Sequence, residues 1–309
     1  SARNVGEIAD DHDLPMAERR DGRFLFLNEK SSPSLWTPAL CRRMLDELAR
    51  FQPAVLEANP AYLARLARFA AACNTRVFQP SIIVLTFELP TAAALRAIRT
   101  VFTSPLCSSY GSTEMGYVFM QCEQGRFHQN SAFCRVDFMP FAAAHGGPLL
   151  GRMLVTPFNH PWCQYVRFDV GDMLRLNRDG RCACGRDDGI VADSIDGRVK
   201  NAIFTDDGRL VSELRVDEAL ADCPGVFDYQ IQQLSSARVT AHIVPADMHA
   251  PPHADDVSAR LRALLGDAVK VQVDFIEDLP VAPSGKFRRV WSRIPFEVAA
   301  LHRGDAVRG

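Results

Sequence analysis

Apolar residues recur with helical spacing in two early stretches, Thr37–Phe51 and Pro60–Ala72. A repeat of three to four residues places such side chains on one face of a helix, so we predict a helix over each stretch. Ser81–Phe87 is short, apolar and β-branched, which predicts a buried strand. Thr91–Phe102 is again helical in its spacing, with Thr91 as the N-cap, and Cys107–Tyr110 is typical of a strand end. This alternation of helices and strands predicts an α/β region with a largely parallel sheet.

The pattern changes twice farther along the chain. From about Phe127 we predict a β-rich subdomain with strands at Ser131–Phe138, Arg152–Pro157 and Cys163–Phe168. After Gly197 the pattern predicts a small α+β module. Its expected elements are a helix at Val211–Ala221, a hairpin of Val226–Leu234 and Ala237–Val244, a helix at Ala254–Leu265 and a strand at Val269–Ile276. We therefore expect a large domain over residues 1–197 and a small one over residues 198–309.

Composition narrows the class of protein. A chain of 309 residues with 47% hydrophobic and 23% charged residues is typical of a globular protein of about two domains. The net charge of −2 does not favour a nucleic-acid partner, and the longest apolar runs are only strand-sized, so no membrane span is expected. Nine cysteines, an odd number, do not suggest a disulfide framework. A reducing, cytoplasmic setting is the expectation.

The most informative segment for chemistry is Ser109–Gly116, where a predicted strand runs into a turn containing Gly111. Backbone N–H groups and the hydroxyls of Ser112 and Thr113 suit a phosphate, and the adjacent Glu114 suits a hard cation such as Mg²⁺. Taken alone, the segment is equally an ordinary glycine turn with a solvated carboxylate.

Three further segments change that balance. Tyr165–Asp172 carries two acidic residues, which we expect at a strand end and its following turn, where a carboxylate can accept from ribose hydroxyls. Asp196–Asn201 falls at the expected domain boundary. Leu279–Arg288 places Lys286 after a glycine in a proline-punctuated loop. Taken alone, each segment is weak evidence for a functional site. A lysine in a loop, for example, is usually a solvated charge.

Together and in this order, these segments resemble the adenylate-forming superfamily. Tyr110–Glu114 is similar to its Tyr-Gly-x-Thr-Glu signature, and Gly197-Arg198-x-Lys200 is similar to its hinge. Glu88-Leu-Pro90 falls where the family carries Gly-Ala-Glu-Pro, although Thr86-Phe87 replaces Gly-Ala here. The roles that the resemblance implies are nucleotide binding by Tyr110, Gly111, Ser112, Glu88, Asp172 and Arg198, catalysis by Thr113, Glu114 and Lys286, Mg²⁺ binding by Glu114, and a pivot at Lys200.

Within the superfamily the chain resembles the phenylacetate–CoA ligase group, some members of which carry a metal at corresponding positions. Cys122 and His128 lie six positions apart, and Cys182-Ala-Cys184 supplies two more thiols. Three thiols and one imidazole form a donor set for a closed, structural zinc site. The alternative is a pair of reduced thiols in a glycine turn.

A glycine-rich phosphate loop is not found before Tyr110. The one candidate, Lys30–Ser34, contains no glycine and so could not wrap N–H groups around phosphate in the usual way. The sequence also starts without Met. We therefore expect the large domain to be truncated, either in a fragment or in a natural short form, and this chain alone could be inactive.

The resemblance implies an AMP-forming acid–thiol ligase that uses ATP, Mg²⁺ and coenzyme A. A small carboxylic acid would become an acyl adenylate, and the acyl group would then pass to a thiol. Two alternatives remain: a non-catalytic or fragmentary relative that binds nucleotide or a partner, and a ligase that loads a carrier protein. A second copy of the chain, in a homodimer, is also among the partners considered.

Overall fold

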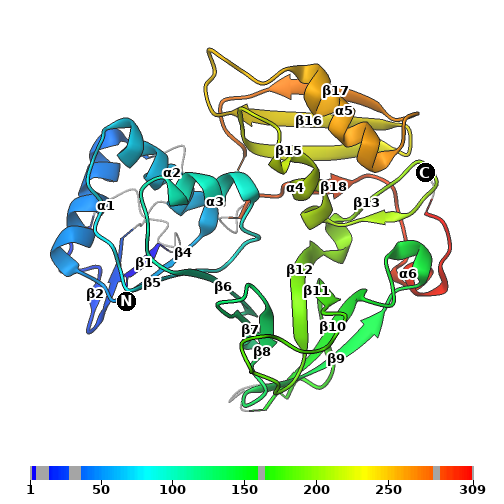
Figure 1. Cartoon of the computed structure of the whole chain (residues 1–309), viewed down its shortest axis with the longest axis horizontal. Coiled ribbons are helices and arrows are strands. Elements are labelled where there is room, and N and C mark those ends of the chain that lie inside the picture. Colours follow the sequence, from blue (N-terminus) through cyan, green and yellow to red (C-terminus); the bar gives the residue numbers. More distant parts are fainter. Residues whose placement is uncertain (1, 5–13, 28–35, 159–163, 281–285, 308–309) are drawn as a thin grey trace. The chain divides into compact units, whose positions relative to one another are not determined.

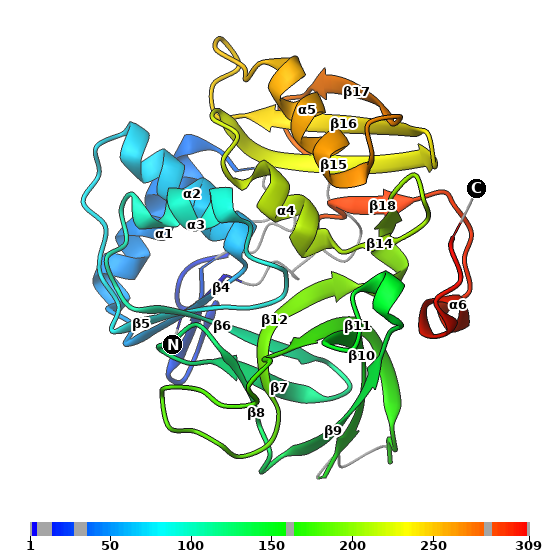
Figure 2. The ribbon, with the colours of Figure 1, turned by 45° about the vertical axis from the view of Figure 1, so that its right-hand side comes forward.

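The computed structural model describes residues 2–4, 14–27, 36–158, 164–280 and 286–307. Contacts divide the chain into two compact units, drawn from two directions in Figures 1 and 2. Unit 1 comprises Ser1–Ser109 and Pro280–Phe287, and unit 2 comprises Tyr110–Leu279 and Arg288–Gly309. The predicted phosphate-loop candidate Lys30–Ser34 lies outside the described residues, as do Cys163 and the stretch 281–285 before Lys286. The expected boundary at residues 197–198, which concerns a mobile C-terminal domain, stays a prediction.

Unit 1 is built on a sheet with the strand order β2-β3-β1-β4-β5-β6. All neighbouring strands are parallel except β2 and β3, as the alternating pattern predicts. The strands are β1 (Ala2–Asn4), β2 (Arg20–Asp21), β3 (Phe24–Phe26), β4 (Val55–Ala58), β5 (Ile82–Leu85) and β6 (Leu106–Ser112), the last of which runs on into unit 2.

Each helix of unit 1 begins directly after a capping side chain, and the N-cap predicted at Thr91 is confirmed. The helices are α1 (Pro38–Phe51), α2 (Pro60–Ala72) and α3 (Ala92–Arg99). The side chains of Thr37, Asn59 and Thr91 accept hydrogen bonds from the first turns of α1, α2 and α3, which satisfies donors that a helix leaves unpaired at its start. The apolar faces of α1 and α2 are buried, so the periodicity that predicted these two helices is confirmed.

Unit 2 contains a six-stranded antiparallel sheet with the order β7-β8-β12-β11-β10-β9. Its strands are β7 (Gly116–Gln121), β8 (Phe127–Gln129), β9 (Cys134–Pro140), β10 (Leu150–Pro157), β11 (Phe168–Leu176) and β12 (Val191–Arg198). Its core contains the completely buried side chains of Val118, Phe119, Met153, Val155 and Leu174. The predicted β-rich subdomain is this sheet.

One predicted strand is misplaced. Among the described residues 164–168 of the predicted Cys163–Phe168, only Phe168 lies in a strand, because β11 begins there and residues 164–167 are irregular. Arg167 adopts a left-handed backbone with φ 51°, which an extended strand does not accommodate, and its N–H donates to Thr156 Oγ1. Asp172 consequently lies within β11 and not in a turn after a strand.

The C-terminal part of unit 2 is an α+β module. Its main sheet has the order β17-β16-β15-β18, and helices α4 and α5 cover one face of it (Figures 1 and 2). The bounds are β13 (Ile203–Phe204), β14 (Leu210–Val211), α4 (Glu213–Ala221), β15 (Val226–Ser235), β16 (Arg238–Pro245), α5 (Ala254–Leu265), β17 (Lys270–Phe275), β18 (Val290–Ser292) and α6 (Val298–Arg303). The predicted hairpin and the bounds of α5 are confirmed. Among the described residues of the whole chain, no helix is long and apolar enough to cross a membrane.

Candidate functional site

The segment Tyr110–Gly116 forms a tight hairpin turn between β6 and β7. The N–H of Met115 donates to the carbonyl and hydroxyl oxygens of Ser112, which closes the turn. A Cβ atom at Gly111 would lie 2.2 Å from the carbonyl oxygen of Gly116, so only glycine allows the two strands to approach this closely. Thr113 and Glu114 are exposed at the tip of the hairpin, where they could meet a ligand from solvent.

Asp172 is the centre of a second cluster. Its Oδ2 atom accepts a hydrogen bond of 2.7 Å from the Tyr110 hydroxyl. Its Oδ1 atom lies 3.6 Å from Nε of Arg198, the residue directly opposite Asp172 in the pairing of β11 with β12. The structure therefore brings together three residues that the sequence places in separate motifs. The Arg198 side chain is about half exposed, at 48%, and can turn toward a ligand.

The pKa of the Tyr110 phenol is raised well above its usual range. Burial is the main cause, followed by the negative charge of Asp172 and by the hydrogen bond to it. Deprotonating Tyr110 would place two like charges side by side in a poorly hydrated site. Tyr110 is therefore a neutral donor that fixes the orientation of the Asp172 carboxylate.

A buried carboxylate lies beneath the predicted hinge. Asp196 is fully buried at the end of β12 and accepts hydrogen bonds from Arg175 (2.6 Å) and Ser212 (3.0 Å). The next residue, Gly197, has φ 93°, which a side-chain-bearing residue rarely adopts. Lys200, the predicted pivot, is exposed in a 3₁₀ helix over Val199–Asn201. Asp196 thus anchors the start of the hinge segment, although sequence reasoning gave it no role.

Two residues of the predicted site, Glu88 and Lys286, belong to unit 1. The Glu88 carboxylate accepts hydrogen bonds from Asn59 Nδ2 (3.1 Å) and from the backbone N–H of Phe287 (3.0 Å). Lys286 is exposed beside Phe287. The nucleotide contact predicted for Glu88 stays a prediction, but the contacts of its carboxylate connect it to the segment that carries Lys286.

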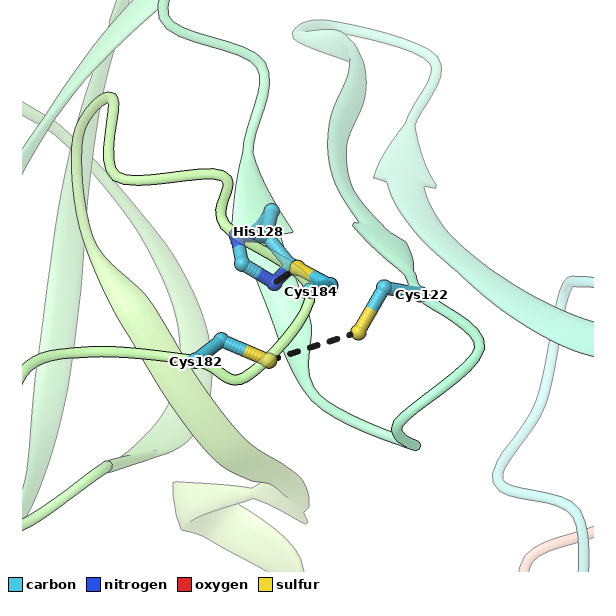
Figure 3. Close-up of side chains that lie close together, drawn as sticks. All are labelled: Cys122, His128, Cys182 and Cys184. Atoms are coloured by element: carbon cyan, nitrogen blue, oxygen red, sulfur yellow. Dashed lines mark hydrogen bonds between the residues drawn. The ribbon is translucent and has the colours of Figure 1, made fainter.

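The four predicted zinc ligands converge on one point, as Figure 3 shows. Cys122 begins the turn after β7, and His128 lies in β8. Cys182 and Cys184 lie in the long connection between β11 and β12. The ligand atoms of all four residues lie within 4.8 Å of one another. Pairing of β8 with β12, which sets Val191 opposite His128, brings the two segments together.

The distances fit a tetrahedral zinc site. Zn–S and Zn–N bonds of about 2.3 and 2.0 Å imply S···S and S···N separations of about 3.8 and 3.5 Å in a tetrahedron. The observed separations are 3.6 Å for the Sγ atoms of Cys122 and Cys182, and 3.3 Å for Cys184 Sγ and His128 Nε2. The donor set and its spacing therefore suit Zn²⁺.

The two cysteine turns share a construction. The N–H of Gly125 donates to the carbonyl of Cys122, and the N–H of Gly185 donates to that of Cys182. Both glycines have positive φ, which lets the chain turn back toward the sulfur atoms. The N–H of Gln124 also donates to Cys122 Sγ, so a backbone donor faces that sulfur atom.

His128 is a buried member of the cluster, with 8% of its surface exposed. Burial, aided by the positive charge of Arg186, lowers the pKa of this imidazole. The neutral ring is the form that binds metal. Arg186 also pairs with Glu123 at 2.8 Å, which joins the two turns outside the cluster. This ion pair is well exposed, so it adds little stability by itself.

Comparison with known proteins identifies the fold as that of the adenylate-forming ligases, and the predicted fold class is confirmed. A structure of 2-hydroxyisobutyryl-CoA ligase in complex with R3-HIB-AMP is 18% identical, covers 83% of this chain and 58% of its own, and has a TM-score of 0.67. Amide bond synthetase McbA from Marinactinospora thermotolerans is 18% identical, with coverages of 85% and 54% and a TM-score of 0.61. ATP-bound MatB from Rhodopseudomonas palustris is 18% identical, with coverages of 86% and 53% and a TM-score of 0.58.

The chain thus spans little more than half the length of these solved structures. Residues 203–293 match the family model of the CapK C-terminal domain. That match falls within the predicted small α+β module. No curated protein matches the sequence.

Proposed function

We propose that this chain belongs to an AMP-forming acid–thiol ligase, which activates a carboxylic acid as an acyl adenylate and transfers the acyl group to coenzyme A. The observation that carries the proposal is the cluster of Tyr110, Asp172 and Arg198. It supplies a fixed carboxylate and a partly exposed guanidinium in a fold shared with structures described as complexes with R3-HIB-AMP and anthranoyl-AMP.

In the first half-reaction, a carboxylate oxygen of the acid attacks the α-phosphorus of ATP and pyrophosphate leaves. Lys286 would neutralise the approaching carboxylate and phosphate, and Thr113 would donate to the α-phosphate. Asp172 and Arg198 would hold the ribose, and Tyr110 would present its ring to adenine. Losing a preorganised charge such as Lys286 typically reduces the rate on the order of 10²–10³-fold.

In the second half-reaction, a thiolate attacks the acyl carbon and AMP leaves. The lysine must withdraw so that the thiol can approach, and Lys200 in the hinge would be the pivot of that movement. Gly197, with its positive φ, gives the hinge a conformation that other residues rarely adopt. The buried Asp196 lies in β12, and its hydrogen bonds from Arg175 and Ser212 would hold that strand in place during the movement.

Two metals fit the residues present. Glu114 is an exposed carboxylate that would hold Mg²⁺, and the ion would supply positive charge against the phosphates. Cys122, His128, Cys182 and Cys184 would hold a structural Zn²⁺ with no open position for substrate. Zinc would join the turn that follows the Tyr110 hairpin to the connection that follows Asp172, and so order the nucleotide site without touching the substrate.

The same Cys₃His set supports placing the protein nearest the phenylacetate–CoA ligase group. A small carboxylic acid and coenzyme A are the proposed substrates. The carrier-protein acceptor, the homodimer and the cytoplasmic location inferred from the sequence stay predictions.

The test of the proposal separates the two half-reactions. In an active preparation, Lys286→Ala should abolish formation of the acyl adenylate while leaving thiol transfer from presynthesised acyl adenylate within a few-fold of the unmodified protein. The control is Lys270→Ala, which removes a lysine from β17, outside the proposed site. Equal losses in both half-reactions would show that Lys286 has a structural role and would refute the two-orientation mechanism.

A further inference from the structure

Phe287, the residue directly after Lys286, is buried in unit 1. Phe287 is 6% exposed, whereas Lys286 and Arg288 on either side are exposed. Phe287 is also the last residue of the segment Pro280–Phe287 that folds with unit 1. The chain enters unit 2 at the next residue, Arg288.

The ring of Phe287 occupies a slot formed by helix α2. Its centroid lies 6.2 Å from that of Tyr62, with the two rings nearly perpendicular at 88°. The guanidinium carbon of Arg65 lies 4.8 Å above the Phe287 ring. Edge-to-face stacking and a cation–π contact both depend on an aromatic ring at this position.

The backbone of Phe287 is fixed as well as its ring. Its N–H donates to Glu88 Oε1, which also accepts from Asn59 Nδ2. Asn59 is buried, and its Oδ1 accepts from the N–H of Ala61 at the start of α2. The side-chain amide of Asn59 therefore both accepts from α2 and donates to Glu88. In this way the helix that contacts the Phe287 ring also aligns the Glu88 carboxylate.

Backbone strain at Phe87, the residue before Glu88, supports a functional role for the contact between Glu88 and Phe287. Phe87 adopts φ 77°, a value that a bulky residue rarely takes, and 40% of it is exposed. Such strain persists where surrounding structure enforces it, and it concentrates at functional sites. Here it turns the chain directly after β5 and orients Glu88 toward the N–H of Phe287.

We propose that Phe287 is a positioning residue: its ring in the α2 slot and its N–H on Glu88 hold Lys286 in the orientation for acyl adenylate formation. Adjacent Cα atoms are about 3.8 Å apart, so anchoring Phe287 confines Lys286 to a small volume. Withdrawal of Lys286 for thiol transfer then requires Phe287 to leave its slot. This inference rests on the function proposed above, because it assigns Lys286 its role.

The anchor is tested first without any nucleotide, by trypsin cleavage after Lys286 in the full chain. Phe287→Ala should accelerate this cleavage at least tenfold, and Glu88→Ala should accelerate it less, because it leaves the ring contacts intact. Phe287→Leu keeps an apolar side chain and should retain part of the protection. The matched control is Phe133→Ala, which removes a 60% exposed ring and should change nothing.

Cleavage after Arg238, at the start of β16, serves as an internal reference for unfolding of the chain as a whole. The anchor is supported when cleavage after Lys286 accelerates relative to cleavage after Arg238. It is refuted when the unmodified chain is cut after Lys286 as fast as the Phe287→Ala variant.

A double-mutant cycle on acyl adenylate affinity tests whether Phe287 acts through Lys286. Lys286→Ala and Phe287→Ala should each weaken binding, and the double variant should bind no more weakly than Lys286→Ala alone. Independent roles would instead give losses that multiply, which would overturn the inference. If the unmodified chain bound no acyl adenylate, the proposed function would fail, and the trypsin result would still decide whether the anchor exists.

Discussion

The two clusters of unit 2 differ in the strength of the contacts between their own polar groups. In the cluster of Tyr110, Asp172 and Arg198, hydroxyl, carboxylate and guanidinium are mutual partners. In the cluster of Cys122, His128, Cys182 and Cys184, three sulfur atoms and one imidazole meet within 4.8 Å and offer one another only weak thiol contacts. The polar groups of the first cluster thus have partners within the protein. The second has the chemistry of a site whose stability depends on a cation.

Chelation should produce the largest effect, because it acts on the cluster that needs a ligand. Zinc should be present at one ion per chain in protein purified without added metal. Removing it should lower the free energy of unfolding by about 4 kcal/mol or more, or the Tm by roughly 10 °C. Elemental analysis and thermal unfolding with and without a chelator make the measurement. A metal content near zero would remove the distinction between the two clusters.

Replacing one ligand should reproduce most of that effect. Cys182→Ser leaves three donors, so the metal is held less tightly and the Tm should fall by several degrees even with added zinc. Cys73→Ser is the matched control, since Cys73 is an exposed thiol on the C-cap of α2. Equal melting temperatures of the two variants would show that Cys182 is an ordinary reduced thiol.

Asp172→Ala should have a smaller effect on stability and a clear one on nucleotide binding. It leaves the largely buried Tyr110 hydroxyl without its acceptor, at a cost of about 1–3 kcal/mol. AMP binding should weaken at least tenfold, as measured by calorimetry beside urea unfolding. Asp172→Asn retains an acceptor oxygen and should recover most of the stability. Unchanged AMP affinity in Asp172→Ala would exclude Asp172 from the nucleotide site.

The smallest expected effect is the pH dependence of stability, which depends on the cluster of Tyr110, Asp172 and Arg198. The pKa of Tyr110 is raised in the folded state above its unfolded value of roughly 10. The folded protein therefore holds this proton more tightly, and the associated stability is complete below pH ~10 and is lost as pH rises above it. Burial also raises the pKa of Tyr62 to about 12 and raises that of Tyr229, so both act in the same direction.

The difference between the unmodified protein and Asp172→Asn isolates Tyr110. This variant removes the carboxylate charge that contributes to the shift, so its stability should fall less steeply above pH 10. Urea unfolding at several alkaline pH values, with tyrosine absorbance as a second observable, provides the test. Parallel pH profiles for the two proteins would show that burial alone sets the pKa of Tyr110.

Local elements were predictable where a few neighbouring residues carry the information. Helices α1, α2 and α5 follow from apolar periodicity, and the start of α3 follows also from the capping side chain of Thr91. The strand expected at Cys163–Phe168 was wrong because Arg167 has a left-handed backbone. Arginine is not a residue type that indicates this conformation in a sequence. Composition there favours a strand, but pairing of β11 with β10 begins only at Phe168.

The sequence alone determined which chemical groups are available: the motif from Tyr110 to Glu114, Asp172, Arg198, Lys286 and the four metal-binding candidates. The sequence also predicted that the four metal-binding candidates form one site, but only the tertiary structure shows through which strand pairings and contacts these groups meet. Cys184 and His128 are 56 positions apart and approach because β8 pairs with β12. Phe287 lies in the motif of Lys286 but received no role from the sequence, and its ring is buried on α2 because it packs against Tyr62 and Arg65, which are distant in sequence. Caps and periodicity act over one or two turns of chain, whereas these contacts depend on strand pairing and on packing between segments far apart in sequence.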